Sequence, residues 1–156
     1  MKPKYVYHGS GTKIKGTLIL KQAFDLGKNS DNTKKGIYAS DHKEEAIEMG
    51  ILKCKSIKGA SVHIQKIKHK LIMDAVIYGG SIKQNHFYLY TLSSKNFKNI
   101  PKGSPQWISS KSVKPIKVEK LLVKDYIYLV RKATKEEKEE WWQEHSIKSK
   151  KRGKNV

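Results

Sequence analysis

The sequence contains a single cysteine, two arginines and no long apolar run, and each shortage excludes a class of protein. One thiol, Cys54, cannot form an internal disulfide, which fits a reducing compartment, and we expect it to be a small semi-buried residue rather than a nucleophile. No apolar run approaches the ~20 residues that span a bilayer, and the opening stretch MKPKYVYHGS lacks the apolar segment of a signal peptide. These absences predict a cytoplasmic protein with no membrane contact.

Acidic residues are also scarce, because 14 Asp and Glu stand against 33 Lys and Arg and leave a net charge of +19. Residues 131–156 hold only 9 of the basic and 5 of the acidic residues, so most of the excess lies in the body of the chain. Lysine supplies 31 of the 33 basic residues. Lysine suits contacts with phosphate, whereas arginine suits the recognition of bases. We therefore expect sequence-tolerant contact with the backbone of a nucleic acid; the alternative is a lysine-rich surface that is merely solvated.

Histidine is present at six positions, but without the pattern of a metal site. A zinc site needs closely spaced His, Cys or carboxylate ligands. The histidines at 42, 63, 69, 86 and 145 show no such spacing with Cys54 or with the acidic residues. We expect no bound metal.

Periodicity predicts more strands than helices. Five segments have the composition of strands: KYVYHG, GIYAS, ASVHIQKI, HFYLYTL and PQWISS. Alternation in ASVHIQKI places Val62 and Ile64 inward, and the nearly continuous apolar run HFYLYTL suits a central strand covered on both faces. The polar segment 25–36 predicts a mobile surface loop. A chain of 156 residues with this pattern predicts a single α+β domain with few helices, built on a split or bent sheet.

Two capping boxes predict where helices begin. Asp41 and Glu44 would open the first helix, and Gly50 would end it. Thr134 and Glu137 would open the second.

The second helix, within residues 132–147, is expected to close a domain that spans residues 1–147. Its Trp141 and Trp142 are interpreted as docking residues in preference to a platform for stacked bases. The remaining residues, 148–156, are strongly basic and predict a disordered tail.

Three short motifs carry the functional signal. The first strand ends in His8-Gly9-Ser10, and the strand GIYAS places Tyr38 directly before the first helix. A later strand, SPQWISS, begins at Gln106. Their order resembles the ADP-ribosyltransferase fold of poly(ADP-ribose) polymerases, diphtheria-type toxins and rifamycin ADP-ribosyltransferases, in the branch that combines a histidine, a tyrosine and a Glu, Asp or Gln. The resemblance covers residues 5–125.

The resemblance implies an enzyme that transfers ADP-ribose from NAD. Because NAD already carries a cationic leaving group, cleavage of its nicotinamide–ribose bond needs orientation and charge stabilisation but no general acid. In this family His8 would hold a ribose hydroxyl, and Tyr38 would stack on the pyridinium ring. The Gly9 backbone would approach the nicotinamide carboxamide, with Ser10 adding a hydrogen bond and Ser40 also contacting the dinucleotide.

Gln106 stands where many members of the family have a glutamate. Glutamine can bind the ribose but cannot serve as a base. This departure favours transfer of a single ADP-ribose, or no transfer, over polymer formation. The acids nearest to the motifs in sequence are Asp31 and Asp41, and neither is assigned the role of base.

The charge indicates which acceptor to expect. A strongly basic ADP-ribosyltransferase would modify a nucleic acid, whose amine or ring nitrogen needs little deprotonation; a protein target stays open, as does an antitoxin partner for a toxin-like enzyme. The alternative function is a catalytically inactive nucleic-acid-binding domain on the same scaffold. An RNA 2′-phosphotransferase is disfavoured, because that family depends on arginines in its core motifs and the first arginine here is Arg131.

Overall fold

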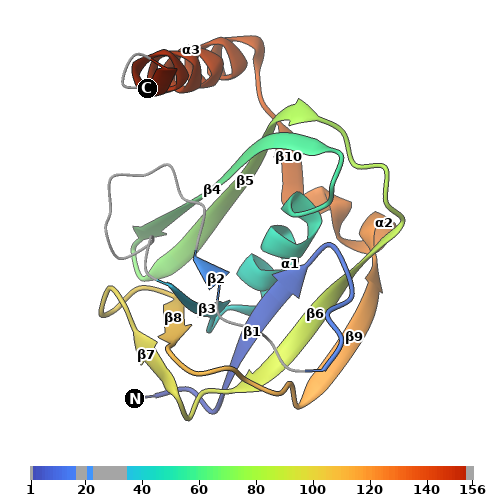
Figure 1. Ribbon diagram of the computed structural model, residues 1–156, viewed down its shortest axis with the longest axis vertical. Helices are drawn as coiled ribbons and strands as arrows, with labels where there is room; N and C mark the ends of the chain where they lie inside the picture. Colours follow the sequence, from blue (N-terminus) through green and yellow to red (C-terminus); the bar gives the residue numbers. More distant parts are fainter. Residues whose placement is uncertain (1, 17–20, 23–34, 154–156) are drawn as a thin grey trace.

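The computed structural model describes residues 2–16, 21–22 and 35–153, which form a mixed α+β domain of two sheets and three helices (Figure 1). The strands are β1 (Tyr5–Ser10), β2 (Lys21–Gln22), β3 (Lys35–Ser40), β4 (Ile57–Ile67), β5 (Lys70–Gly80), β6 (His86–Ser93), β7 (Phe97–Asn99), β8 (Gln106–Ser109), β9 (Lys117–Leu122) and β10 (Val130–Lys132). The helices are α1 (Lys43–Leu52), α2 (Val123–Tyr126) and α3 (Lys135–Gly153), with a single-turn 3-10 helix, η2 (Ile127–Leu129). The α+β prediction is confirmed, whereas most of the expected loop at 25–36 lies outside the described residues.

The larger sheet is antiparallel and has the strand order β7-β8-β3-β1-β6-β9, with β2 paired to one end of β3. Phe87 and Leu89 of β6 pack against α1, while Tyr90 and Leu92 point into a second apolar cluster on the opposite face. All four side chains are fully buried. The expectation that HFYLYTL is an inner strand covered on both faces is therefore confirmed.

The smaller sheet has the order β10-β5-β4 and consists mainly of the long β4–β5 hairpin (Figure 1). The hairpin turns at Lys68 and His69, both with positive φ, as tight two-residue hairpin turns require. Ile64, predicted to point inward, is 37% exposed, and Val62 is only half-buried. The prediction failed because alternation indicates which residues share a face and not how far along the strand that face is covered.

Helix α3 is attached to this hairpin through the two tryptophans. The Trp141 ring stacks on Tyr78 of β5 at a centroid distance of 5.1 Å, and Trp142 Nε1 donates to the Tyr78 carbonyl at 3.3 Å. Gly59 and Gly79 make room, since a Cβ at either position would lie less than 3.0 Å from an indole ring. The docking interpretation of both tryptophans is confirmed.

The start of α3 agrees with the prediction from the sequence, and its end does not. Its start is the expected capping box, in which the Glu137 carboxylate accepts from Thr134 N at 3.0 Å and Thr134 Oγ1 accepts from Glu137 N at 3.2 Å. Its end lies at Gly153, within the segment expected to be a disordered tail. The run SIKSKKR contains no proline, and cations near a helix C-terminus interact favourably with its dipole, so the helix can continue. No helix in the described part of the chain is long and apolar enough to cross a membrane.

Helix α1 begins and ends differently from the prediction. It starts at Lys43 with His42 as its cap residue, and no side chain caps it. Asp41, expected to be the cap, instead accepts a hydrogen bond from Trp107 Nε1 at 3.0 Å. Gly50, expected to end the helix, is buried inside it because Phe87 and Gly9 lie against its α-carbon. The prediction that Gly50 ends the helix is therefore wrong, because this glycine allows close packing inside it.

Candidate functional site

A split between two neighbouring strands creates the site. Strand β1 pairs with β6 at all six of its residues, but with β3 at only one position, Tyr7 opposite Ser40. Beyond this pair the strands separate, and His8 bridges the opening by placing Nδ1 2.7 Å from the carbonyl oxygen of Tyr38. The opening is the mouth of a pocket between the sheet and α1.

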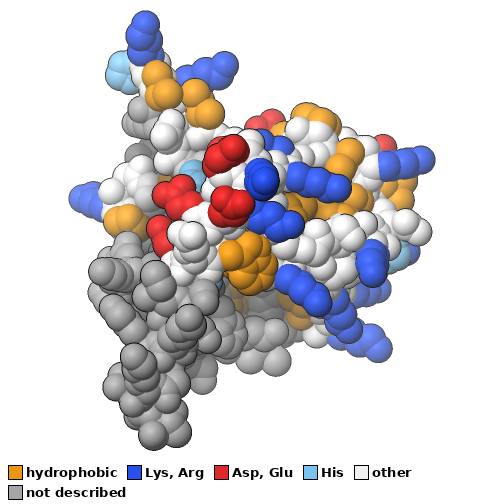
Figure 2. Space-filling view, turned by 90° about the horizontal axis from the view of Figure 1, so that it is seen from above, with side chains coloured by type: hydrophobic (Ala, Val, Ile, Leu, Met, Phe, Trp, Pro, Cys, Tyr) orange, Lys and Arg blue, Asp and Glu red, His pale blue; other side chains and the backbone are white. Residues whose placement is uncertain are grey.

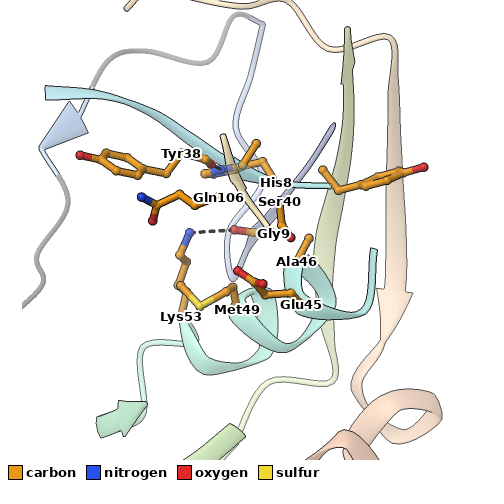
Figure 3. Close-up of a pocket in the computed structure, with 11 residues that line it drawn as sticks. His8, Gly9, Tyr38, Ser40, Glu45, Ala46, Met49, Lys53 and Gln106 are labelled. Atoms are coloured by element: carbon orange, nitrogen blue, oxygen red, sulfur yellow. Dashed lines mark hydrogen bonds between the residues drawn. The ribbon is translucent and has the colours of Figure 1, made fainter. Parts of the chain in front are cut away.

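Five of the six residues expected to bind NAD or act in catalysis line this one pocket (Figure 3). They are His8, Gly9, Tyr38, Ser40 and Gln106. The empty space at the pocket is about 390 Å³, and this figure includes open solvent. Residues from β1, β3 and β8, far apart in the sequence, therefore meet at one place.

The sixth expected residue, Ser10, does not line the pocket. It is buried, and its hydroxyl donates to the Thr12 carbonyl at 2.7 Å while accepting from Thr12 N at 3.3 Å. Ser10 therefore shapes the turn after β1, as serine hydroxyls commonly do. Its expected contact with a carboxamide is corrected to a structural role.

The hydrogen bond of His8 determines which of its nitrogens carries the proton. A carbonyl oxygen can only accept, so Nδ1 must be the protonated nitrogen toward Tyr38. In the neutral ring Nε2 is then the accepting nitrogen. This tautomer suits a ligand that offers a hydroxyl group.

Tyr38 and Gln106 lie on the same face of the sheet as α1. The register pairs Ser40 with Gln106, and Tyr38 is two residues from Ser40 on β3, so all three point the same way. Figure 3 shows the Tyr38 ring and the Gln106 side chain next to each other, opposite the residues of α1. A flat group that enters between the sheet and α1 would contact the Tyr38 ring and the Gln106 amide.

The loop between β7 and β8 holds the Gln106 side chain in place. Gln106 Nε2 donates to the Ile100 backbone carbonyl at 2.8 Å, and Asn99 Nδ2 donates to the backbone carbonyl of Gln106 at the same distance. With its amide nitrogen donating to this carbonyl, Gln106 has Oε1 as the acceptor atom of its side chain. A glutamate here would bring a carboxylate oxygen against that same carbonyl, which is a physical reason for glutamine at this position.

Gly9 is constrained by α1 as well as by its place in the pocket. A Cβ at this position would lie 1.9 Å from the Ala46 carbonyl oxygen and 2.6 Å from Gly50 N. On the other side of the residue, Lys53 Nζ donates to the Gly9 carbonyl at 3.1 Å, as the dashed line in Figure 3 marks. Glycine is thus needed for packing, and an ammonium group lies where a carboxamide was expected to approach.

Two charged residues of the pocket, Glu45 and Lys53, were missed in the sequence. Glu45 lies on α1, and Lys53 directly follows it. Asp41 and Asp31 were considered instead, but Asp41 is bound to Trp107 and does not line the pocket, and Asp31 lies outside the described residues. The available signal was that a helix directly following a site strand faces the site with its first turn.

The Glu45 carboxyl is partly removed from water. Its Oε2 is buried and has no hydrogen-bond partner among the described residues. Burial raises the pKa of Glu45, and a hydrogen bond from Ser40 and the nearby His42 oppose that rise. The pocket therefore contains an acid whose proton affinity is higher than that of an exposed glutamate.

The remaining candidate groups contribute no second site. Cys54 is 2% exposed and so more deeply buried than the predicted semi-buried residue, and burial raises the pKa of its thiol. No group of three or more His, Cys, Asp or Glu side chains within the described residues is arranged to hold a metal ion.

Comparisons with protein-family models, with curated proteins and with solved structures returned no match to this chain.

Proposed function

We propose that the protein is a NAD-dependent mono-ADP-ribosyltransferase. The observation that carries this proposal is the meeting of His8, Gly9, Tyr38, Ser40 and Gln106 in one pocket at the split between β1 and β3. These residues belong to three sequence motifs that lie far apart in the chain. A chance set drawn from three strands would not be expected to line a single pocket.

The side chains fit the chemistry of NAD cleavage. His8 Nε2 and Gln106 Oε1 are acceptors suited to ribose hydroxyls, and the Tyr38 ring offers a face on which the pyridinium can stack. Held in this way, the nicotinamide–ribose bond breaks with its electron pair leaving on neutral nicotinamide, and a nucleophile adds to the ribose. The pocket supplies orientation, which is what a substrate with a built-in leaving group requires.

Surface charge supports a polyanionic acceptor. Every lysine whose burial the structure describes is exposed. Figure 2 shows that on one face basic side chains spread widely, beside a smaller group of acidic ones. Such a distribution favours sequence-tolerant contact with DNA or RNA, and protein remains the second acceptor class.

A nucleic-acid-binding domain without transferase activity is the second candidate function. Two contacts favour it: Lys53 is bonded to the Gly9 carbonyl, and Gln106 donates its amide to Ile100. Both groups are already engaged in the absence of a ligand.

Nicotinamide release from NAD separates the two candidates. We expect release that rises with added RNA or DNA, and a decrease of roughly 10²-fold or more in His8→Ala and in Tyr38→Ala. Matched controls outside the pocket are His63→Ala and Tyr128→Ala, both at exposed positions, which should retain wild-type rates. Absence of release in the wild type, with salt-sensitive nucleic-acid binding retained in all variants, would instead support the second candidate.

A further inference from the structure

The proposed reaction lacks a base at the position where one is expected. An acceptor that attacks the ribose through an N–H or O–H group must lose a proton, and an amide cannot take it. Gln106 is fixed as an amide by its bond to Ile100. Among the described residues that line the pocket, Glu45 is the one carboxylate.

Resting on the proposed function, we propose that Glu45 of α1 is the general base that accepts the proton of the attacking nucleophile. Figure 3 shows the Glu45 carboxylate on the helix side of the pocket, turned toward Gly9 and the end of Lys53, and across the pocket from Tyr38 and Gln106. The carboxylate and the ribose-binding residues thus lie on opposite walls. A ribose held by His8 and Gln106 would present its reactive carbon between them.

The state of the carboxylate oxygens supports this role. Ser40, itself in the pocket, lowers the pKa of the Glu45 carboxyl and so favours its charged form, although burial has the larger effect. Oε2 is buried without a hydrogen-bond partner among the described residues. Such an arrangement costs stability, so its presence calls for a functional reason. A proton donor that enters with the substrate would complete the site.

Several charged or titratable groups act on Glu45. From the connection between β3 and α1, His42 lowers its pKa and Asp41 raises it, and both effects are smaller than that of burial. The other charged or titratable groups among the described pocket residues are Tyr7, His8 and Tyr38 of the sheet and Lys53 directly after α1. Glu48 interacts with Glu45 from the same helix. The net effect is a carboxylate more basic than usual, and a base works best when its pKa approaches the working pH.

The step balances without any further reactant. The ribose–nitrogen bond of NAD breaks, and its electron pair leaves with nicotinamide. The nucleophile X–H forms the new X–ribose bond and passes its proton to Glu45 Oε2. Loss of that proton to water then restores the carboxylate.

The test compares Glu45→Gln with Glu44→Gln, its exposed neighbour outside the pocket. With nucleic acid as acceptor, we expect nicotinamide release to fall by about 10²- to 10³-fold in Glu45→Gln and to stay unchanged in Glu44→Gln. The acidic limb of the rate–pH profile should disappear in Glu45→Gln. NAD affinity, measured by calorimetry, should stay within about threefold of wild type, because glutamine keeps the size of the side chain and remains polar.

Azide provides a readout that a structural role would not change. The azide anion has no proton to lose, so it needs no base. With azide as nucleophile, Glu45→Gln and the wild type should release nicotinamide at similar rates.

The outcomes separate this inference from the function on which it rests. Equal rates and equal pH profiles for Glu45→Gln and the wild type with nucleic acid would overturn the role of Glu45 and leave the transferase standing. A deficit that azide does not restore would mean that Glu45 acts in shaping the pocket and not as a base. A wild type that releases no nicotinamide under any condition would remove both proposals.

Discussion

Glu48 should make the stability of the fold depend on pH. This residue of α1 is 2% exposed, and its Oε2 has no hydrogen-bond partner among the described residues. Burial, followed by the negative charges of Glu45, Glu44 and Asp74, raises its pKa from 4.5 to about 7. The folded protein therefore holds this carboxyl in its neutral form more strongly than the unfolded chain does.

The size of the effect follows from the two pKa values. Each pH unit between them corresponds to about 1.4 kcal/mol, so ionising Glu48 in the folded protein costs about 3 kcal/mol. The sign is that of a raised acid: the stabilisation is present at low pH and is lost as the pH rises from 4.5 to about 7. For a domain with a total stability of about 5–15 kcal/mol, this loss is substantial.

Urea denaturation between pH 4 and pH 8 measures this loss of stability on ionisation of Glu48. Glu48→Gln removes the titrating carboxyl and keeps the shape of the side chain, while Glu139→Gln on the exposed face of α3 is the control. The free energy of unfolding of the wild type minus that of Glu48→Gln should fall by about 3 kcal/mol across this window. A pH-independent difference would refute the reasoning, whatever its absolute value, because any fixed cost of the glutamine amide does not vary with pH.

Three further substitutions follow from the packing. Gly9→Ala should lower the free energy of unfolding by about 2–3 kcal/mol or more in urea, because its Cβ meets backbone atoms of α1 that cannot move aside; an unchanged stability would contradict the close approach of β1 and α1. Gln106→Glu should not increase nicotinamide release and should cost about 1–3 kcal/mol at pH 8 but less at pH 5, since only the protonated carboxyl can donate to Ile100. A stability equal to that of wild type at both pH values would show that the loop does not hold this side chain. Trp141→Ala should expose α3 to limited proteolysis, because the indole stacks on Tyr78 and fills the space above Gly59. Tyr128→Ala, at an exposed position, should not have this effect. Equal resistance of the two variants to the protease would mean that Trp142 alone docks the helix.

The parts of the site that could be predicted are those that depend on strand order. His8, Tyr38 and Gln106 each belong to a short strand with a recognisable neighbour pattern, and antiparallel pairing brings such strands together. Which residues share a face follows from the two-residue period of a strand. The meeting of these residues therefore required no knowledge of side-chain packing.

The parts that could not be predicted depend on contacts between distant segments. Glu45 and Lys53 enter the pocket only because α1 lies directly against β1, and that approach requires glycine at both Gly9 and Gly50. In the sequence Gly50 is indistinguishable from a helix stop. Likewise, Asp41 stands where the sequence predicts an N-cap residue, but its carboxylate accepts a hydrogen bond from the indole of Trp107, which is far away in the chain.

The central claim is that the pocket at the split between β1 and β3 binds NAD. The most direct measurement is a titration with NAD followed by the backbone amide signals in nuclear magnetic resonance spectra of the ¹⁵N-labelled protein. The account predicts saturable shifts at Gly9, Tyr38, Ser40 and Gln106, with the β4–β5 hairpin turn at Lys68 and His69 unaffected. Shifts confined to exposed lysines, or none at all, would contradict it, because they would show that NAD meets the protein only as an anion on a basic surface, if it binds at all.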